Sequence, residues 1–171
     1  GLVGTLLTAL VTPFETHILR PIDFVKNPHK FLELTGQVKA TVWVGPDSMY
    51  RILTKAIHQK KLDIDLSSLK VCLCGSEPVL LETFNQFKQA AEPYGWNPLT
   101  FTPGYGQAEN VLSISFGILR THIKTHEKNK RQIVSCGKPS RDVKAQVLDE
   151  NQKLVKDGIE GQIWIQSPSL C

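Results

Sequence analysis

The sequence predicts an α/β fold in which a mostly parallel sheet is flanked by helices and is followed by antiparallel strands. Two observations predict the first part. The apolar runs 71–74 and 99–102 are each followed by a glycine-containing loop and then by a stretch with helical character. Repetition of strand, loop and helix is typical of an open parallel sheet. A third observation predicts the antiparallel part, since residues 143–148 and 162–166 alternate with the period of a strand.

The N-terminal part predicts a helix, a short strand and a second helix. Residues 1–11 are apolar, and residues 16–19 can form a short strand. Asparagine is a favoured helix cap and proline a favoured first-turn residue, so Asn27 and Pro28 predict the start of the second helix. Gly36 can end it.

The middle of the chain alternates between strands and helices. Residues 40–44 are rich in β-branched side chains and predict a strand. Asp47 or Ser48 can cap the helix that follows. Its apolar side chains recur at the i, i+3, i+4 spacing of a helix: Met49, Ile52, Leu53, Ala56 and Ile57. After residues 71–74, another helix has one apolar face: Leu81, Phe84, Phe87 and Ala91. We interpret both faces as core.

The helical pattern ends after about residue 116, and we place a domain boundary near residue 131. Residues 1–130 then form an α/β subdomain and residues 131–171 begin a second, β-rich subdomain. The basic stretch 124–131 also contains a histidine and a glutamate, and it predicts a solvated loop.

Composition excludes several classes of function. The chain has 171 residues with 41% hydrophobic content, which suffices for a buried core. The net charge of +4 is mild and no long basic block occurs, so we expect no nucleic-acid partner. No apolar run is long enough for a transmembrane segment. The four cysteines lack the spacing of a zinc or redox motif, which predicts reduced thiols and a cytoplasmic location.

Two loops contain the candidate site. If their strands are parallel neighbours, both loops lie at one edge of the sheet, where such sheets bind ligands. Tyr105, between two glycines, offers a flat face for a planar ring such as a nucleobase. Glu109, four residues later, can bind Mg²⁺. The residues alone leave two readings open: a nucleotide site, or two ordinary turns with a glutamate in the first turn of a helix and a core tyrosine.

These loops and their surroundings resemble the adenylate-forming superfamily, most closely its fatty acyl-AMP ligases and acyl-CoA synthetases. The resemblance rests on the glycine-acid-proline-valine loop that begins at residue 75, on Pro-Tyr-Gly-Trp at 93–96, and on the Tyr-Gly-x-Ala-Glu loop at 105–109. Residues 1–4, 40–47, 135–139 and 161–165 also resemble family segments, so the likeness covers nearly the whole chain. The last two are similar to the entry into a small β-barrel subdomain.

The resemblance implies a parent enzyme that activates a fatty or related carboxylic acid with ATP, giving an acyl-adenylate and pyrophosphate. It implies ATP and Mg²⁺ as cofactors, and an acyl carrier protein or CoA as possible acceptor. Glu109 would bind Mg²⁺ and Tyr105 would pack on adenine. Four residues would border adenine and ribose, largely through backbone atoms: Gly75, Ser76, Glu77 and Pro78. Three would lie near the α-phosphate and the reacting carboxylate: Gly104, Gly106 and Gln107. Three are candidates for the wall of an acyl tunnel: Val44, Gly45 and Met49.

The sequence also lacks parts of the family pattern. The Ser/Thr-rich phosphate loop, a ribose-binding aspartate and the lysine of the C-terminal lid are absent. We therefore interpret the chain as an internal fragment that needs the remainder of its parent chain and is inactive alone. Residues 116–134 are shorter than their counterpart in many fatty acyl-AMP ligases, which keeps an acyl-CoA synthetase open. A non-catalytic nucleotide- or acyl-binding module also stays open. An unrelated dinucleotide-binding domain is disfavoured, because no strand leads into GxGxxG.

Overall fold

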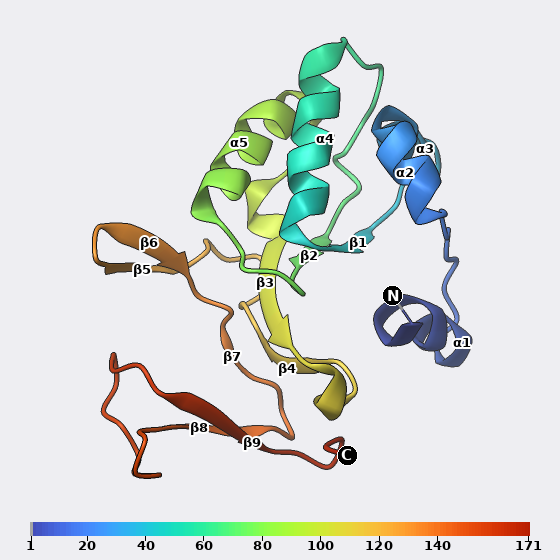
Figure 1. Ribbon diagram of the computed structural model, residues 1–171. Helices are drawn as coiled ribbons and strands as arrows, with labels where there is room; N and C mark the ends of the chain where they lie inside the picture. Colours follow the sequence, from blue (N-terminus) through green and yellow to red (C-terminus); the bar gives the residue numbers. More distant parts are fainter. Residues whose placement is uncertain (1) are drawn as a thin grey trace.

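A five-stranded sheet in the order β1-β2-β3-β4-β7 forms the centre of the computed structural model, which describes residues 2–171 (Figure 1). Gly1, the first residue of the predicted N-terminal helix and of the family-like segment 1–4, lies outside the described residues. The strands β1, β2 and β3 are parallel, whereas β4 and β7 are antiparallel to their neighbours. Their bounds are Val42–Gly45, Val71–Cys74, Phe101–Gly106, Ser113–Phe116 and Lys138–Pro139. The predicted mostly parallel sheet with antiparallel strands after it is confirmed.

Two helices connect the parallel strands and lie on the same face of the sheet. Helix α4 (Asp47–Gln59) links β1 to β2, and α5 (Leu81–Ala91) links β2 to β3. Both connections advance the sheet by one strand in the same direction, and such crossovers are right-handed, so both helices cover one face. Figure 1 shows α4 and α5 packed side by side above the sheet, with α3 (Pro28–Gln37) beside α4.

The N-terminal part differs from its prediction in two elements, an additional helix and a missing strand. A turn of π-helix (Leu2–Leu7) continues into α1 (Thr8–Val11), and α2 (Pro21–Lys26) precedes α3. Pro28 is the first residue of α3, as predicted, although the side chain of Asn27 makes no capping hydrogen bond. Residues 16–19 form no strand. Thr16, His17 and Leu19 instead line a cleft beside β1.

Alternate side chains of the parallel strands divide between the two faces. Trp43, Cys72 and Cys74 point toward the helices and are buried, whereas Val42 and Val44 are 55% and 38% exposed. On the helix side, the Tyr50 ring meets Phe87 and Phe101 edge-on, at centroid distances of 5.2 and 5.1 Å. The core predicted from the apolar helix faces is therefore confirmed, and it lies between α4, α5 and one face of the sheet.

Cys72 and Cys74 are free thiols that are buried in the core. The Trp96 indole N–H donates to Cys72 Sγ at 3.3 Å. Burial raises the pKa of Cys72 to about 11, and it raises the pKa of Cys74 as well. Both stay protonated at neutral pH, and since the thiolate is the reactive form, they act as small core residues rather than as nucleophiles.

Two antiparallel hairpins lie outside the central sheet, one before and one after β7 (Figure 1). Strands β8 (Lys144–Leu148) and β9 (Gln162–Gln166) pair along their whole length, which confirms the predicted antiparallel pair. Strands β5 (Thr125–Lys128) and β6 (Arg131–Val134) form a hairpin where a solvated loop was predicted. Asn129 and Lys130 both have positive φ, 50° and 61°, which matches the two-residue turn that joins twisted strands. The domain boundary near residue 131 stays a prediction.

Two glycines with similar backbone conformation provide a matched stability test. Gly137 and Gly158 have φ of 81° and 84°. A Cβ at Gly137 would overlap the carbonyl oxygen of Phe116, whereas a Cβ at Gly158 would meet no atom within 4 Å. We expect Gly158→Ala to lower the free energy of unfolding by about 1 kcal/mol, the cost of a left-handed alanine. Gly137→Ala should cost at least about 1 kcal/mol more, because it adds overlap. Urea unfolding of the two variants measures the difference, and equal losses would contradict the close approach.

Candidate functional site

The loops after β1 and β2 lie together at one edge of the sheet. Gly45 is in register with Cys74, so the two strands end at the same level. The Gly75 N–H then donates to the carbonyl oxygen of Gly45 at 3.2 Å and continues the parallel ladder by one bond. The loop that begins at Gly75 therefore starts directly beside the end of β1.

The third loop reaches the same edge because β3 extends beyond β2. Cys74 pairs with Pro103, so Gly104 lies just past the end of β2. A Cβ at Gly75 would lie 2.8 Å from the carbonyl oxygen of Gly104, which shows how closely the two loops approach. The predicted convergence of all three loops on one edge is confirmed, and Tyr105 and Ser76 lie at that edge.

The segment from Gly104 to Gly106 is part of a strand rather than a free loop. It pairs with β4, and the register shifts between Tyr105 and Gly106. A Cβ at Gly104 would lie 2.9 Å from the Phe116 ring, and one at Gly106 would overlap the carbonyl oxygen of Leu112. The close approach of β4 therefore requires both glycines. The helix predicted after Glu109 is wrong: residues 113–116 instead form β4, which pairs antiparallel with β3.

Tyr105 is 37% exposed, so it is not a core aromatic. Gln107 is half-buried and precedes a single 3₁₀ turn, Ala108–Asn110. Glu109, in this turn, is exposed. Within residues 2–171, no hydrogen bond or ion pair engages the Glu109 carboxylate. The backbone carbonyl oxygen of Glu109 accepts from the Cys171 N–H at 3.0 Å and from the Cys171 thiol at 3.2 Å. The aromatic face and the carboxylate both remain accessible to a ligand.

A strained turn directly follows Glu109. Val111 has φ 64° and ψ −53°, and the Leu112 N–H donates to the Asn110 carbonyl oxygen at 2.7 Å, which together define a γ-turn. A β-branched residue in this conformation is rare and costs on the order of 1–3 kcal/mol. Asn110 is buried and its amide donates to the Ser113 carbonyl oxygen at 2.8 Å. Asn110 was not singled out from the sequence, although asparagine is a common turn residue.

The residues at this edge fit a magnesium ion that is bound partly by phosphate. The described residues contain no cluster of three or more His, Cys, Asp or Glu side chains that could hold a metal ion by themselves. Mg²⁺ in nucleotide sites typically takes one or two carboxylates, several waters and substrate phosphates. A single exposed carboxylate such as that of Glu109 is consistent with that arrangement.

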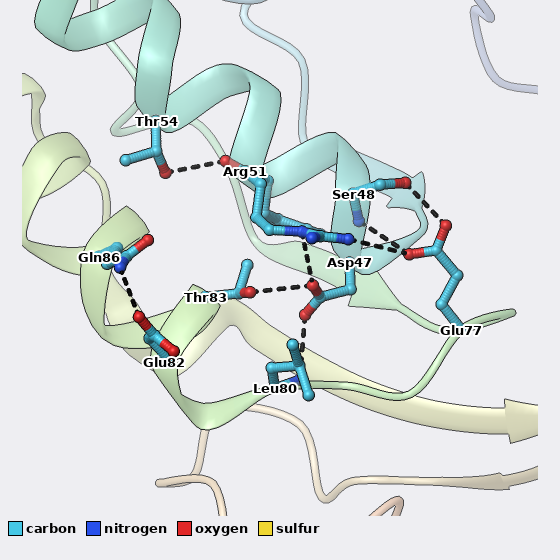
Figure 2. Close-up of polar contacts among 10 residues, drawn as sticks. Asp47, Ser48, Arg51, Thr54, Glu77, Leu80, Glu82, Thr83 and Gln86 are labelled. Atoms are coloured by element: carbon cyan, nitrogen blue, oxygen red, sulfur yellow. Dashed lines mark hydrogen bonds and ion pairs between the residues drawn. The ribbon is translucent and has the colours of Figure 1, made fainter.

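Glu77 has a structural partner that the sequence did not predict. Its carboxylate accepts from the backbone N–H of Ser48 at 3.0 Å and from the Ser48 hydroxyl at 2.8 Å (Figure 2). Arg51 Nη2 lies 4.0 Å from Glu77 Oε2. The hydrogen bonds from Ser48, together with Arg51, lower the pKa of Glu77, which is therefore ionised at neutral pH. Glu77 thus caps the first turn of α4.

The predicted capping role of Asp47 in its own helix is wrong. Asp47 is the first residue of α4, and its carboxylate, only 1% exposed, reaches the start of α5 instead. It accepts from the Leu80 N–H at 3.0 Å and from the Thr83 hydroxyl at 2.9 Å (Figure 2). Arg51 Nε pairs with it at 3.2 Å. Burying a carboxylate is tolerated only with such partners, and Asp47 has them.

The three residues predicted for an acyl wall do not all line one cavity. A cleft of about 670 Å³ lies beside the edge strand β1, between α3 and the residues that precede α2, and Val44 lines it together with Phe14, Phe31 and Val42. Met49 is buried and packs against Gly45, where a Cβ would overlap Met49 Sδ. Gly45 and Met49 are not among the residues that line the cleft. Among the described residues, no helix is both long and apolar enough to cross a membrane.

Comparison with known proteins gives consistent matches. A family model described as AMP-binding enzyme matches residues 1–171. A medium-chain-fatty-acid–acyl-carrier-protein ligase from Teredinibacter turnerae is 29% identical over 184 residues, which cover 96% of this chain and 29% of the relative. A long-chain-fatty-acid–AMP ligase from Mycobacterium marinum is 29% identical over 195 residues, which cover 99% of this chain and 31% of the relative.

A solved structure matches the fold over nearly the whole chain. The fatty acyl-adenylate ligase from L. pneumophila, in complex with acyl adenylate and pyrophosphate, superposes with a TM-score of 0.91 at 28% identity. The match covers 99% of this chain and 33% of that chain. This chain therefore spans about a third of the length of the proteins that it matches.

Proposed function

Because this chain belongs to the AMP-binding enzyme family, we propose that its parent protein activates a fatty or related carboxylic acid with ATP, releasing pyrophosphate and forming an acyl-adenylate. The observation that carries the proposal is the meeting of three strand-end loops at one edge, with Gly75 against Gly104 and Tyr105 exposed there, and with Glu109 exposed in the turn that follows β3. The names of the relatives supply the substrate class: medium-chain and long-chain fatty acids.

The proposal gives each predicted residue a role in binding or alignment. Tyr105 would stack on adenine, and the backbone of residues 75–78 would border adenine and ribose. The backbone at Gly104 and Gly106 and the side chain of Gln107 would lie near the α-phosphate and the attacking carboxylate. Since a carboxylate is a weak nucleophile and a triphosphate is highly charged, catalysis depends mainly on alignment and charge neutralisation. Glu109 would hold Mg²⁺, which when bound neutralises phosphate charge.

The acyl chain would lie against the open face of β1. This part of the proposal is supported by Val44, which lines the cleft beside β1 together with Phe14 and Phe31. Gly45 and Met49 pack against each other directly after Val44, so they would support the wall of the acyl pocket without lining it. Residues 131–171 would begin a second subdomain, and the free thiols of the chain support a cytoplasmic location.

The alternatives to this proposal differ in the acceptor of the acyl group, or in whether the parent protein is an enzyme at all. A relative named for its acyl carrier protein favours that acceptor, whereas the short segment 116–134 keeps CoA, and hence an acyl-CoA synthetase, as the second candidate. A non-catalytic module with the same nucleotide- or acyl-binding edge is the third. The parent sequence on either side of this chain distinguishes the enzyme from the non-catalytic module. A phosphate loop and a lysine-bearing lid there would favour the enzyme.

ATP–pyrophosphate exchange with a panel of fatty acids tests the proposed function. The parent protein should catalyse exchange that depends on the fatty acid, and the 171-residue chain alone should not, because its sequence lacks the phosphate loop and the lid lysine. Acyl-adenylate that is then transferred to a carrier protein or to CoA identifies the acceptor. A parent protein without exchange for any acid would favour the binding module, and robust exchange by the chain alone would show that the missing segments are dispensable.

A further inference from the structure

The loop at residues 75–78 contains a backbone conformation that must be held in place. Ser76 is exposed and has φ of 67°, in the left-handed region that a non-glycine residue adopts only at a cost. Such residues persist where the surrounding structure fixes the chain on both sides, and they are concentrated in ligand-binding segments. The contacts that hold residues 75–78 in this conformation therefore indicate whether the loop is built to bind a ligand.

Helix α4 and the end of β1 fix the loop on both sides of Ser76. Before it, the Gly75 N–H is bonded to the Gly45 carbonyl oxygen. After it, Glu77 is bonded to the backbone and hydroxyl of Ser48. At the far end of the loop, the Leu80 N–H is bonded to the buried carboxylate of Asp47. The loop is therefore anchored at three of its residues: Gly75, Glu77 and Leu80.

The contacts between α4 and the loop form an exchange of helix caps. Glu77, from the loop that leads into α5, caps the first turn of α4; Asp47, from the first turn of α4, caps the start of α5. Arg51, one turn into α4, lies next to both carboxylates, with its guanidinium 3.2 Å from Asp47 and 4.0 Å from Glu77 (Figure 2). A negative charge at a helix N-terminus is favourable, so each carboxylate stabilises the other's helix. Neither helix can move at this end without displacing the loop.

We propose that Ser48, with Asp47 and Arg51, positions the 75–78 loop for nucleotide binding, and that Ser48 acts through Glu77. This inference rests on the proposed function, because it assigns a purpose to the edge where the nucleotide would lie. Ser48 is a positioning residue: its hydroxyl is bonded to Glu77 and directs the loop backbone, which in turn borders the ligand.

Amide hydrogen exchange of the parent protein without nucleotide tests the positioning itself. Ser48→Ala removes the hydroxyl bond to Glu77 and should speed exchange at residues 75–80 by at least about threefold, since the loop samples open states more often. Ser48→Thr keeps a hydroxyl and should restore the wild-type rate. Thr54→Val is the matched control: it removes a 2.8 Å bond to the Tyr50 carbonyl oxygen in the same helix, away from the loop. It should leave exchange at 75–80 unchanged.

Steady-state kinetics of the parent protein test the consequence for the nucleotide. Ser48→Ala should raise KM for ATP about three- to tenfold and leave kcat and KM for the fatty acid within about twofold, a pattern of lost ground-state binding. A double-mutant cycle then tests whether Ser48 affects ATP binding through Glu77. In a Glu77→Ala background, Ser48→Ala should have no further effect on KM for ATP, because its partner is already gone.

Each outcome decides between distinct conclusions. Unchanged exchange at residues 75–80 in Ser48→Ala overturns the positioning role. Faster exchange with an unchanged KM for ATP overturns the link to the nucleotide, and additive effects of Ser48→Ala and Glu77→Ala overturn the route through Glu77. A wild-type parent that neither binds nor turns over ATP overturns the proposed function together with this inference, whereas wild-type turnover with an unaffected Ser48→Ala overturns the inference alone.

Discussion

Replacing Glu109 with glutamine in the parent protein is expected to slow adenylation by at least about tenfold, equivalent to a loss of roughly 1.4 kcal/mol of transition-state stabilisation. Glutamine keeps the size of the side chain but removes the charge that would hold Mg²⁺. The loss can reach about a thousandfold if this carboxylate is the main protein ligand, since metal stabilisation of a transition state is worth several kcal/mol. The rate of fatty-acid-dependent ATP–pyrophosphate exchange at saturating substrates measures the effect.

Thermal stability and a control variant distinguish magnesium binding by Glu109 from the alternative, a glutamate that only stabilises the first turn of a helix. Glu109 is exposed and its carboxylate has no partner among residues 2–171, so the midpoint of thermal unfolding should barely change. Glu92→Gln is the matched control, because Glu92 is also exposed but follows α5 at the opposite edge of the sheet. The rate of ATP–pyrophosphate exchange by Glu92→Gln should equal that of the wild type. A Glu109→Gln enzyme that remains fully active at limiting Mg²⁺ would contradict metal binding.

Tyr105→Ala is expected to weaken ATP binding by the parent protein by about 1–2 kcal/mol, or roughly five- to thirtyfold in Kd. The tyrosine ring is accessible at the edge where the loops meet, and a base stacked on it would lose most of that contact area without the ring. Calorimetric titration with ATP in the absence of a fatty acid measures the change separately from chemistry.

The conservative variant isolates the contribution of the ring. Tyr105→Phe should bind ATP almost as tightly as the wild type, because stacking needs the aromatic face and not the hydroxyl group. If Tyr105→Phe weakens binding as much as Tyr105→Ala, the hydroxyl is the important group and the stacking role is wrong. If neither variant changes binding, the nucleotide does not contact Tyr105.

The sequence was informative where structure depends on residues that are close along the chain. The apolar spacing in α4 and α5 and the β-branched run of β1 fixed the type of each element, and the order of strands and helices then required a shared edge. The return of residues 113–116 as β4 was not predictable in this way, because it depends on pairing with β3 and on a γ-turn at Val111 that β-branched residues rarely adopt.

Capping was the other point at which local reasoning was insufficient. An aspartate at a helix start normally caps its own helix, yet Asp47 bonds to Leu80 and Thr83, more than thirty positions away, and Glu77 takes its place at α4. Only the side-by-side packing of α4 and α5 brings these partners together. The three-dimensional structure therefore shows which carboxylate caps which helix, whereas the spacing of residues along the sequence does not.

The mixed direction of the sheet has a consequence for how quickly its parts assemble. The pairs β5–β6 and β8–β9 are antiparallel hairpins whose strands are near one another in sequence, and a short connection, residues 107–112, joins β3 to β4. Pairing β1 with β2 and β2 with β3 instead requires each chain segment to close a long loop through a helix, which is slow because the entropy of closure precedes any gain in contacts. The edge that holds Gly75 and Tyr105 exists only after both parallel pairs have formed. We therefore expect the hairpins to be early structures in folding, and the candidate site to be among the last.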